Sequence, residues 1–386
     1  MRKIALISTS RADYGIQARL IRRLADDPQV DFAMIVSGTH LSARHGRTIE
    51  EIRKDGIPIA AEVEIGVDAG SPVEEMAARA LRGFSSVLKT IGPDLVVLLG
   101  DRYEMLSAAL ACVFNGIPIA HLHGGETTAG ATDEVFRHAI TKAAYLHFTS
   151  CEEYRQRVIQ LGEDPARVFN VGAMGVENAR LLPAISREEL ASSLGMELRE
   201  RIFVVTFHPV TFEQGTAVAQ VRELLTALEK FADQTSIVFT HPNADREGDS
   251  VAEAIAAFAA DHAGSKLVAS LGSVRYLALV RIASAVIGNS SSGIIEVPSF
   301  CVPTVNIGDR QAGRVQASSV VNCSPDRGEI ARAIDYALSS EHAQTVRTTS
   351  NPYDRPGTME SIHRQLVTCD LDGCLKKRFY DLGVMR

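Results

Sequence analysis

The sequence predicts an α/β protein with two doubly wound domains, each built around a parallel sheet. Short apolar runs without polar alternation recur along the chain, as expected for parallel strands that are buried on both faces. Longer stretches with helical spacing separate these runs, and within 221–231 the residues Leu224, Leu228 and Phe231 share one helical face. The runs form two series, and a length of 386 residues suits two large domains.

The predicted strands follow these two series. In the first series they are residues 4–8, 32–37, 95–99, 117–122, 146–149 and 168–171. In the second series they are residues 202–207, 236–240, 267–269, 285–288, 304–307 and 320–322. Strand, helix and strand repeated through each series are typical of α/β architecture.

The joint between the domains is predicted in 172–187, where Gly-Ala-Met-Gly and Leu-Leu-Pro interrupt the pattern. The first domain is expected at 1–172 and the second at 173–364. The stretch 359–382 has helical spacing, and a C-terminal helix at 365–386 is expected to pack back on the first domain. In open α/β sheets, ligands bind at the carboxyl ends of the strands, so we expect a central cleft lined by both domains.

The composition excludes several classes of protein. Hydrophobic residues make up 46% and charged residues 23%, which excludes a largely disordered or collagen-like chain. The formal net charge of −7 disfavours a nucleic-acid partner, which needs basic surface, but permits a local basic pocket for an anionic small molecule. No apolar stretch reaches about 18 residues, so we expect no membrane partner.

The cysteines point to a reducing compartment. They lie at six scattered positions without the paired spacing of metal ligands: 112, 151, 301, 323, 369 and 374. The first residues contain too short an apolar run for a secretory leader. We therefore expect a cytoplasmic protein.

The strongest local motif is Gly-Asn-Ser-Ser-Ser-Gly at 288–293, directly after a predicted strand and at the start of a predicted helix. Small residues let the backbone approach a ligand, and serine hydroxyls with N–H groups at a helix start bind anions. Glu296, about one turn further, is placed to accept hydrogen bonds from a ribose. A helix cap needs one serine rather than three, which favours a phosphate site over a simple cap.

A second loop of this kind, Ser-Thr-Ser-Arg-Ala-Asp-Tyr-Gly at 8–15, follows the first predicted strand. Arg11 stands where its guanidinium could bind a phosphate with two hydrogen bonds. A solvated loop is an equally good interpretation.

Three acidic segments lie at sheet ends of the first domain. Asp101 follows one strand, His-Leu-His-Gly-Gly-Glu at 121–126 ends the next, and Thr-Asp-Glu-Val-Phe-Arg-His at 132–138 opens a helix. Two or more carboxylates in one cleft could do acid–base work on a polyhydroxylated substrate. His121 and His123 are two residues apart on a strand, without a carboxylate at ligand spacing, so no metal site is predicted.

Three segments of the second domain could add to an anion site. His208-Pro and His241-Pro end corresponding strands, and their recurrence favours a function over a mere strand stop. Gly-Asp-Arg-Gln-Ala-Gly-Arg at 308–314 offers two guanidinium groups to an anion.

Together these motifs closely resemble the hydrolysing UDP-N-acetylglucosamine 2-epimerases of sialic acid biosynthesis. The motifs cover nearly the whole chain in order, at 8–15, 100–104, 121–126, 136–142, 207–209, 287–293 and 306–314. The resemblance implies the GT-B fold, in which two Rossmann-like domains flank a central cleft. It also implies a UDP-sugar substrate and no cofactor, and we expect a homo-oligomer, a dimer or a tetramer.

The resemblance also implies roles for individual residues. Those implied to bind the nucleotide are Ser290 and Ser291 (diphosphate), Glu296 (ribose), Arg310, Asn243 and Leu271, with Arg11, Ala12 and Arg102 from the first domain. Those implied to be catalytic are Asp101, Asp133, His123, Glu126 and His208, the last near the phosphates and sugar. The non-hydrolysing epimerases carry a glutamate where this chain has His123, and which of His123 and Glu126 takes that role is left open.

The implied reaction is an anti elimination followed by hydration. UDP leaves C1, a carboxylate removes the C2 proton, and water then adds to the resulting 2-acetamidoglucal, so that the glycosidic C–O bond is hydrolysed. The products are N-acetylmannosamine and UDP. The alternatives are the corresponding UDP-N,N′-diacetylbacillosamine 2-epimerase for legionaminic acid, a GT-B glycosyltransferase and a non-catalytic nucleotide-sugar binding protein. The several acids and histidines of the first domain exceed what a transferase with one base needs, and would be costly in a mere binding protein.

Overall fold

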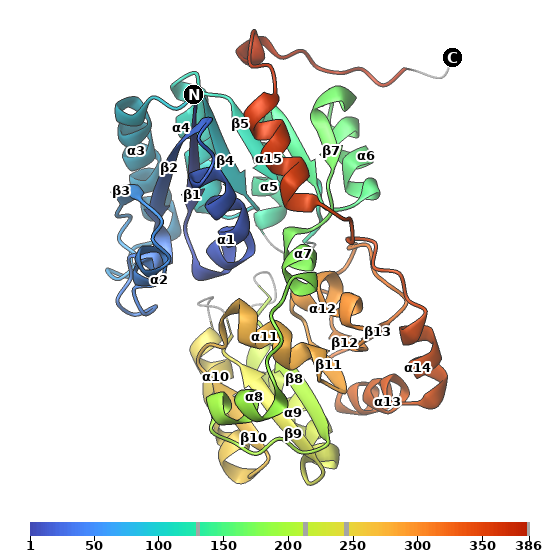
Figure 1. Cartoon of the computed structure of the whole chain (residues 1–386). Helices are drawn as coiled ribbons and strands as arrows, with labels where there is room; N and C mark the ends of the chain where they lie inside the picture. Colours follow the sequence, from blue (N-terminus) through green and yellow to red (C-terminus); the bar gives the residue numbers. More distant parts are fainter. Residues whose placement is uncertain (129–131, 211–214, 243–246, 384–386) are drawn as a thin grey trace. The chain divides into compact units, whose positions relative to one another are not determined.

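The computed structural model describes residues 1–128, 132–210, 215–242 and 247–383. The chain divides into two compact units (Figure 1). Unit 1 consists of Met1–Glu126, Asp133–Glu177 and Arg355–Arg386, apart from its last three residues, which lie outside the described ranges. Unit 2 consists of Asn178–Asp354 together with a short stretch that includes Thr127 and Thr128.

Unit 1 is built on a parallel sheet whose described strands number seven, in the order β3-β2-β1-β4-β5-β6-β7. Their bounds are β1 (Arg2–Ser8), β2 (Val30–Ser37), β3 (Ile59–Val63), β4 (Leu95–Leu99), β5 (Ile119–Leu122), β6 (Leu146–Thr149) and β7 (Val168–Asn170). The helices are α1 (Arg11–Ala25), η1 (Gly38–His40), α2 (Ile49–Lys54), α3 (Val73–Ile91), α4 (Tyr103–Phe114), α5 (Asp133–Ala143), α6 (Glu152–Gln160), η2 (Pro165–Arg167), α15 (Thr358–Thr368) and η4 (Cys374–Lys376). Helix α7 (Met174–Arg180) spans the change from unit 1 to unit 2.

Unit 2 repeats this architecture around a second parallel sheet, whose described strands number six, in the order β10-β9-β8-β11-β12-β13. Their bounds are β8 (Arg201–Thr206), β9 (Thr235–Thr240), β10 (Ser265–Val268), β11 (Ala285–Gly288), β12 (Thr304–Ile307) and β13 (Val320–Cys323). The helices are α8 (Arg187–Leu194), α9 (Ala217–Ala232), α10 (Gly248–Asp261), α11 (Gly272–Arg281), α12 (Ser291–Ile295), η3 (Val297–Phe300), α13 (Arg327–Ala337) and α14 (Ser340–Arg347).

Each sheet is buried on both faces, which explains the uninterrupted apolar runs of the sequence. In β1, Ile4 and Leu6 pack toward α1 and α15, whereas Ala5 and Ile7 pack toward α3 and α4. The strands of unit 2 alternate in the same way between two apolar clusters. The prediction of two doubly wound parallel sheets is therefore confirmed.

In each unit the strand order reverses once, and the reversal marks a crevice for a ligand. It falls between β1 and β4 in unit 1 and between β8 and β11 in unit 2. Loops that follow such neighbouring strands diverge to opposite faces of the sheet and leave space at their carboxyl ends. The loops at 8–15 and 100–104 meet this condition in unit 1, and those at 207–209 and 288–293 meet it in unit 2.

Two expectations about secondary structure are corrected. Strand β3 was not predicted, because it is an edge strand whose burial alternates and whose sequence Ile-Ala-Ala-Glu-Val lacks a continuous apolar run. The helix expected through 359–382, and at 365–386, ends at Thr368 in α15. Cys369 is extended, and the carboxylate of Asp370 accepts a hydrogen bond from the backbone N–H of Asp372, a local bond that competes with a helix. Helix α15 itself packs in unit 1, against α1. Within the described ranges, no helix has the length and apolar character that a bilayer crossing requires.

Candidate active site

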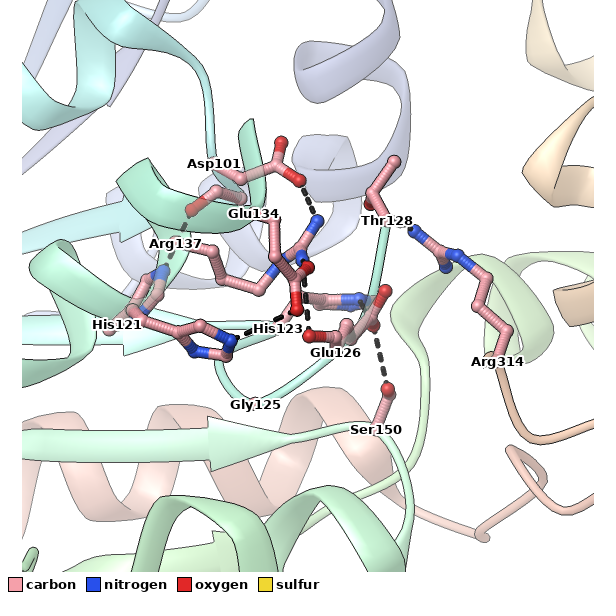
Figure 2. A network of polar contacts seen from close by, with 12 residues as sticks. Asp101, His121, His123, Gly125, Glu126, Thr128, Glu134, Arg137, Ser150 and Arg314 are labelled. Carbon is pink, nitrogen blue, oxygen red and sulfur yellow. Dashed lines mark hydrogen bonds and ion pairs between the residues drawn. The ribbon is translucent and has the colours of Figure 1, made fainter. Parts of the chain in front are cut away.

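Unit 1 gathers polar side chains at the carboxyl ends of β4, β5 and β6 (Figure 2). Arg137 of α5 lies at the centre of this cluster and is only 1% exposed. Its guanidinium makes an ion pair with Asp101, which follows β4, and donates to Glu134 Oε2 at 2.6 Å and to the backbone carbonyl of Glu126 at 3.1 Å. One buried cation therefore links the segments after β4 and β5 with the start of α5.

His123 and Glu126 form a hydrogen-bonded pair within the loop after β5. Nδ1 of His123 lies 2.8 Å from Oε1 of Glu126, and the hydroxyl of Ser150, after β6, donates to the same oxygen at 2.7 Å. The Glu126 side chain is 6% exposed and that of His123 is 15% exposed. His123 also adopts a positive φ of 64°, which is uncommon for a residue other than glycine.

His121 is a buried residue of β5 that bonds the segment after β4. It lies on β5 between Leu98 and His147 of the neighbouring strands and is fully buried. Its Nε2 donates to the carbonyl of Gly100 at 2.8 Å, which leaves Nδ1 to accept from the Thr141 hydroxyl at 3.1 Å. Burial lowers the pKa of His121 to about 3, so the ring is neutral at physiological pH. Both ring nitrogens are engaged, which leaves neither for a metal ion.

The two glycines of the His-Leu-His-Gly-Gly-Glu motif are required by close packing. Gly125 has a φ of 77°, and a Cβ there would lie 2.5 Å from the Tyr154 carbonyl. A Cβ on Gly124 would lie 3.0 Å from both His121 Nδ1 and the Thr141 hydroxyl. The tight turn brings Glu126 back toward His123.

The acids that open α5 are Asp133 and Glu134. Asp133 is the first residue of α5 and is half-buried. Glu134 binds Arg137 through Oε2, and its Oε1 lies 3.1 Å from Nε2 of His138. Thr128, further along the loop after β5, is counted with unit 2 and accepts a hydrogen bond from Arg314 at 3.3 Å.

The loop after β1 is held by a buried carboxylate. Asp13 Oδ2 accepts from the backbone N–H groups of Thr9 at 2.8 Å and Ser10 at 3.1 Å, and Ser10 and Asp13 form a capping box at the start of α1. Burial raises the pKa of Asp13. Arg11 and Ala12, in the first turn of α1, are half-buried and exposed respectively, and Arg11 makes an ion pair with Glu51 at 3.2 Å.

Arg102 precedes α4 and approaches the buried carboxylate of Glu104 with two nitrogens, Nε at 3.2 Å and Nη2 at 3.3 Å. The charge of Glu104 raises the pKa of Arg102 further above its ordinary value. Arg102 is thus a fixed cation beside the switch point of unit 1.

In unit 2, the loops after β8 and β11 are joined by Asn289. Its Oδ1 accepts from the backbone N–H of His208 at 2.7 Å, and its Nδ2 donates to the carbonyl of His208 at 2.8 Å. Its own carbonyl accepts from Arg310 Nη1 at 3.1 Å and from Gln311 Nε2 at 2.9 Å. Three predicted segments of unit 2 therefore meet at one buried asparagine.

The His208 side chain is buried and lies near the charge of Arg310. Burial, together with this charge, lowers the pKa of His208 to about 3. The ring is therefore neutral at physiological pH and can exchange hydrogen bonds with a ligand, but it is a poor source of a proton.

The serine-rich motif forms the predicted turn from strand to helix. Gly288 has a φ of 131°, and a Cβ there would lie 1.8 Å from the Thr206 carbonyl, so only glycine lets β11 and β8 pair this closely. Ser290 is the N-cap of the short helix α12, and its hydroxyl accepts from the N–H of Ser292 at 3.4 Å. Ser291 begins α12 and Glu296 follows its last residue.

The remaining predicted residues of unit 2 precede the serine-rich motif in the chain. Leu271 precedes α11 and is buried, and its carbonyl accepts from Arg275 at 2.9 Å. His241, after β9, is exposed, and its Nδ1 lies 3.0 Å from its neighbour's carbonyl. Asn243 lies outside the described residues.

Three residues that bond the loops at the strand ends were not predicted from the sequence: Arg137, Ser150 and Asn289. A signal for Arg137 was present, because it lies three positions before Ile140 in α5, on the face that an amphipathic helix normally fills with apolar residues. An arginine in such a position is buried and must have acidic partners. Among the described residues, no three His, Cys, Asp or Glu side chains are arranged to hold a metal ion.

Comparison with known proteins gives matches along nearly the whole chain. A protein-family model described as UDP-N-acetylglucosamine 2-epimerase matches residues 22–367. Polysialic acid biosynthesis protein P7 of Escherichia coli is 39% identical over 355 residues, which cover 92% of this chain and 90% of that protein. The GDP/UDP-N,N′-diacetylbacillosamine 2-epimerase (hydrolyzing) of Campylobacter jejuni is 35% identical over 385 residues, 99% of each chain.

A solved structure extends the likeness to three dimensions. The UDP-GlcNAc 2-epimerase of Neisseria meningitidis bound to UDP-GlcNAc superposes with a TM-score of 0.80 at 15% identity. The match covers 95% of this chain and 100% of that one. At this identity the likeness shows a shared fold.

Proposed function

Because this chain belongs to the UDP-N-acetylglucosamine 2-epimerase family, we propose that it is a hydrolysing 2-epimerase that converts UDP-N-acetylglucosamine into N-acetylmannosamine and UDP. The observation that carries this proposal is the cluster of Asp101, His123 and Glu126 around Arg137 in unit 1. Epimerisation needs two acid–base groups at C2, and this cluster supplies more than one. The motif resemblance that suggested the family is confirmed by the comparisons.

The reaction has a physical difficulty that the cluster helps to solve. The C2 proton is not next to a carbonyl and is barely acidic. Departure of UDP from C1 gives the ring oxocarbenium character, which acidifies C2–H. Cationic and N–H donors around the diphosphate stabilise the leaving anion. A carboxylate then takes the C2 proton, and the unsaturated sugar is hydrated.

We assign nucleotide binding to unit 2. Ser290 and Ser291 would bind the diphosphate through hydroxyl and N–H groups, Glu296 would bind the ribose, and Arg310 would add positive charge. The neutral His208 would lie near the phosphates, because Asn289 holds its backbone beside the serine loop. From unit 1, Arg11 and Arg102 are the expected cationic contributors.

Acid–base chemistry is assigned to unit 1, with Asp101, Asp133 and the pair of His123 and Glu126 as the groups that act at the sugar. No cofactor is required, because elimination and hydration involve no redox change. The activity is also expected to survive exhaustive chelation, because arginine side chains can neutralise the diphosphate in place of a metal ion. Loss of activity that one divalent cation restores would contradict this expectation.

The sugar has a second candidate. The C. jejuni relative, which matches 99% of this chain, is named for UDP-N,N′-diacetylbacillosamine, whereas the E. coli relative is named for polysialic acid biosynthesis. The two substrates differ at C4 and C6 of the sugar. A parallel assay of the purified protein with both nucleotide sugars decides between them, and we expect the higher kcat/KM with UDP-N-acetylglucosamine.

The decisive experiment identifies the products in labelled water. A hydrolysing epimerase should release free UDP and a free 2-epimerised sugar carrying about one deuterium at C2 after reaction in deuterated water, because proton-transfer groups exchange with solvent. In ¹⁸O-labelled water the label should appear at C1 of the sugar, analysed before the open-chain form exchanges its oxygen. Label in the UDP would show attack at phosphorus. A UDP-linked manno sugar in equilibrium with its gluco epimer would indicate the reversible reaction.

Two properties complete the proposal. The six cysteine thiols are all free, which suits a reducing compartment, and we propose the cytoplasm. We also propose a homo-oligomer, a dimer or a tetramer, which light scattering of the purified protein would measure.

A further inference from the structure

Two neighbouring side chains, His123 and Glu126, compete for one acid–base role, and their contacts distinguish them. The inference below rests on the proposed function and deepens it. Glu126 is 4% exposed, and its Oε1 accepts hydrogen bonds from two sides. One comes from the Ser150 hydroxyl at 2.7 Å and the other from His123 Nδ1 at 2.8 Å. An oxygen engaged in this way is held in place.

These bonds determine the orientation of the His123 ring. An ionised carboxylate can only accept hydrogen bonds, so Nδ1 of His123 carries the hydrogen in this pair. The other nitrogen, Nε2, is buried and has no hydrogen-bond partner among the described residues. An imidazole with a carboxylate behind one nitrogen and an available second nitrogen is the arrangement that general acid–base catalysis uses.

The backbone of His123 supports a functional role. Its φ of 64° would suit glycine, as at Gly125 two residues later. The backbone N–H of His123 donates to the carbonyl of Phe148 at 2.8 Å, which anchors this conformation to β6. A bulky side chain kept in a left-handed conformation at a site of clustered acids is a typical sign of function.

The partner group is Asp101, whose carboxylate is paired with the buried guanidinium of Arg137. The carboxylate of Asp101 can accept a proton. An imidazolium at His123 can donate one from Nε2 while its Nδ1–H stays bonded to Glu126. The two side chains are therefore suited to act as base and acid.

We propose that His123 is the catalytic acid that protonates C2 in the second half of the reaction, and that Glu126 is its positioning residue. In the first half, Asp101 takes the C2 proton, the C–H electron pair forms the C1=C2 double bond, and the C1–O bond breaks as UDP leaves with its electron pair. In the second half, the C1=C2 electron pair takes the proton from Nε2 of His123 onto C2, and the oxygen of water bonds to C1. The water keeps one hydrogen in the new C1 hydroxyl and loses the other as a proton. Of this proton and the one held by Asp101, one reprotonates His123 and the other passes to solvent.

The test separates the two half-reactions. His123→Asn removes the proton donor, and asparagine tolerates a positive φ. With UDP-N-acetylglucosamine, this variant should still release UDP while 2-acetamidoglucal accumulates, and formation of N-acetylmannosamine should fall at least 100-fold. A purely structural role would instead lower UDP release and epimer formation together.

Two further variants test the division of roles. His123→Gly relaxes the backbone and leaves a space that added imidazole can enter, so imidazole should restore epimer formation at least tenfold. Cys301→Gly is the matched control, because Cys301 also has a positive φ (52°) but is exposed in unit 2, and imidazole should not affect it. Glu126→Gln keeps an acceptor for Nδ1–H. Its rate of epimer formation should therefore fall less than that of His123→Asn, and its KM should be nearly unchanged.

Three results would overturn the inference. The first is a His123→Asn variant that makes the epimer at more than a tenth of the parent rate. The second is loss of UDP release in that variant with UDP binding intact. The third is a Glu126→Gln variant as inactive as His123→Asn. If the parent protein itself releases neither UDP nor an epimerised sugar from either nucleotide sugar, the proposed function fails instead, which is a separate outcome.

Discussion

Asn289 holds His208 by both hydrogen-bonding groups of its amide, accepting from the His208 N–H at 2.7 Å and donating to the His208 carbonyl at 2.8 Å. The side chain thus bonds the His208 backbone as a neighbouring strand would, and it joins the loops after β8 and β11. Asn289 is itself 1% exposed, so each of these bonds replaces one that water would otherwise make.

Asn289→Asp should destabilise unit 2. The aspartate can still accept from the His208 N–H, but it cannot donate to the His208 carbonyl and it brings a charge into a buried site. We expect a loss of about 1–3 kcal/mol in the free energy of unfolding, measured by chemical denaturation. Asn322→Asp is the control, because the Asn322 amide also accepts and donates hydrogen bonds but lies at an exposed position of β13, so this change should lower stability less. Equal effects of both changes would contradict the proposed importance of this buried bond.

Gly288→Ala should disrupt the serine loop. The added Cβ would lie 1.8 Å from the Thr206 carbonyl, so β11 and β8 would have to separate. The expected result is loss of UDP binding in titration calorimetry together with a lower unfolding midpoint. Gly308→Ala is the matched control. The φ of Gly308 is also positive (70°), but no atom would lie within 4 Å of the added Cβ. This change should therefore lower the free energy of unfolding by only about 1 kcal/mol. If Gly288→Ala costs no more than Gly308→Ala, the close approach is not required.

Binding and chemistry should respond to different substitutions. Ser290→Ala combined with Ser291→Ala should weaken UDP binding by about 1–3 kcal/mol, the scale of lost hydrogen bonds to a charged group. Asp101→Asn should leave UDP affinity nearly unchanged and abolish turnover, because it removes a proton acceptor. Calorimetry with UDP and a product assay measure the two effects. More than about a tenth of the parent turnover in Asp101→Asn would remove this residue from the acid–base role.

The stability should fall as the pH falls below neutrality. Burial lowers the pKa of His121 to about 3, and burial together with Arg310 lowers that of His208 to about 3. The unfolded chain protonates histidine near pH 6.5, so between about pH 6.5 and 3 it binds more protons than the folded chain. The free energy of unfolding should therefore decrease through this window by about 1.4 kcal/mol per pH unit for each such histidine.

Denaturation curves at pH 7.5 and pH 5 check this expectation. His208→Gln should reduce the dependence of the free energy of unfolding on pH, because it removes one histidine that the unfolded chain protonates more readily than the folded chain. His45→Gln, at an exposed histidine, is the control and should leave the slope unchanged. A parent protein with equal stability at both pH values would refute the expected dependence.

Lys377 should stabilise unit 1 from the C-terminal tail. Its ammonium donates to Glu163 at 2.8 Å and to the carbonyls of Lys142 and Ala144 at the end of α5. Glu163 is buried, and although burial opposes ionisation, its contacts with His147, Lys142 and Lys377 lower its pKa to about 2. Lys377→Met should therefore lower the free energy of unfolding by about 1–3 kcal/mol.

The neighbouring Lys376 provides the matched control for this change, because it is exposed. Lys376→Met should leave the unfolding midpoint within experimental error of the parent. Similar effects of the two substitutions would show that the tail does not stabilise unit 1 through Lys377. Since Arg137 lies in the same helix α5, turnover of the Lys377→Met variant is worth measuring alongside its stability.

Much of the molecule follows from local patterns in the sequence. Apolar runs predicted most strands of both sheets because a parallel strand covered on two faces is usually apolar on both, as β4 is. Asp101, His123 and Glu126 could be expected near one another because parallel strands end at the same edge. The edge strand β3, with only one apolar face, lacked that pattern and was missed.

Only the tertiary structure identified the partners of these residues. Arg137 reaches Asp101 across 36 positions of the chain, and Asn289 reaches His208 across 81. Such bonds depend on which loops the strand order brings together, and a periodic pattern along the chain contains no information about neighbours across a sheet. Local periodicity reflects whether each residue is buried or exposed. Hydrogen bonds between distant residues arise instead from the topology of the folded chain. The chemistry of the candidate site depends on those bonds.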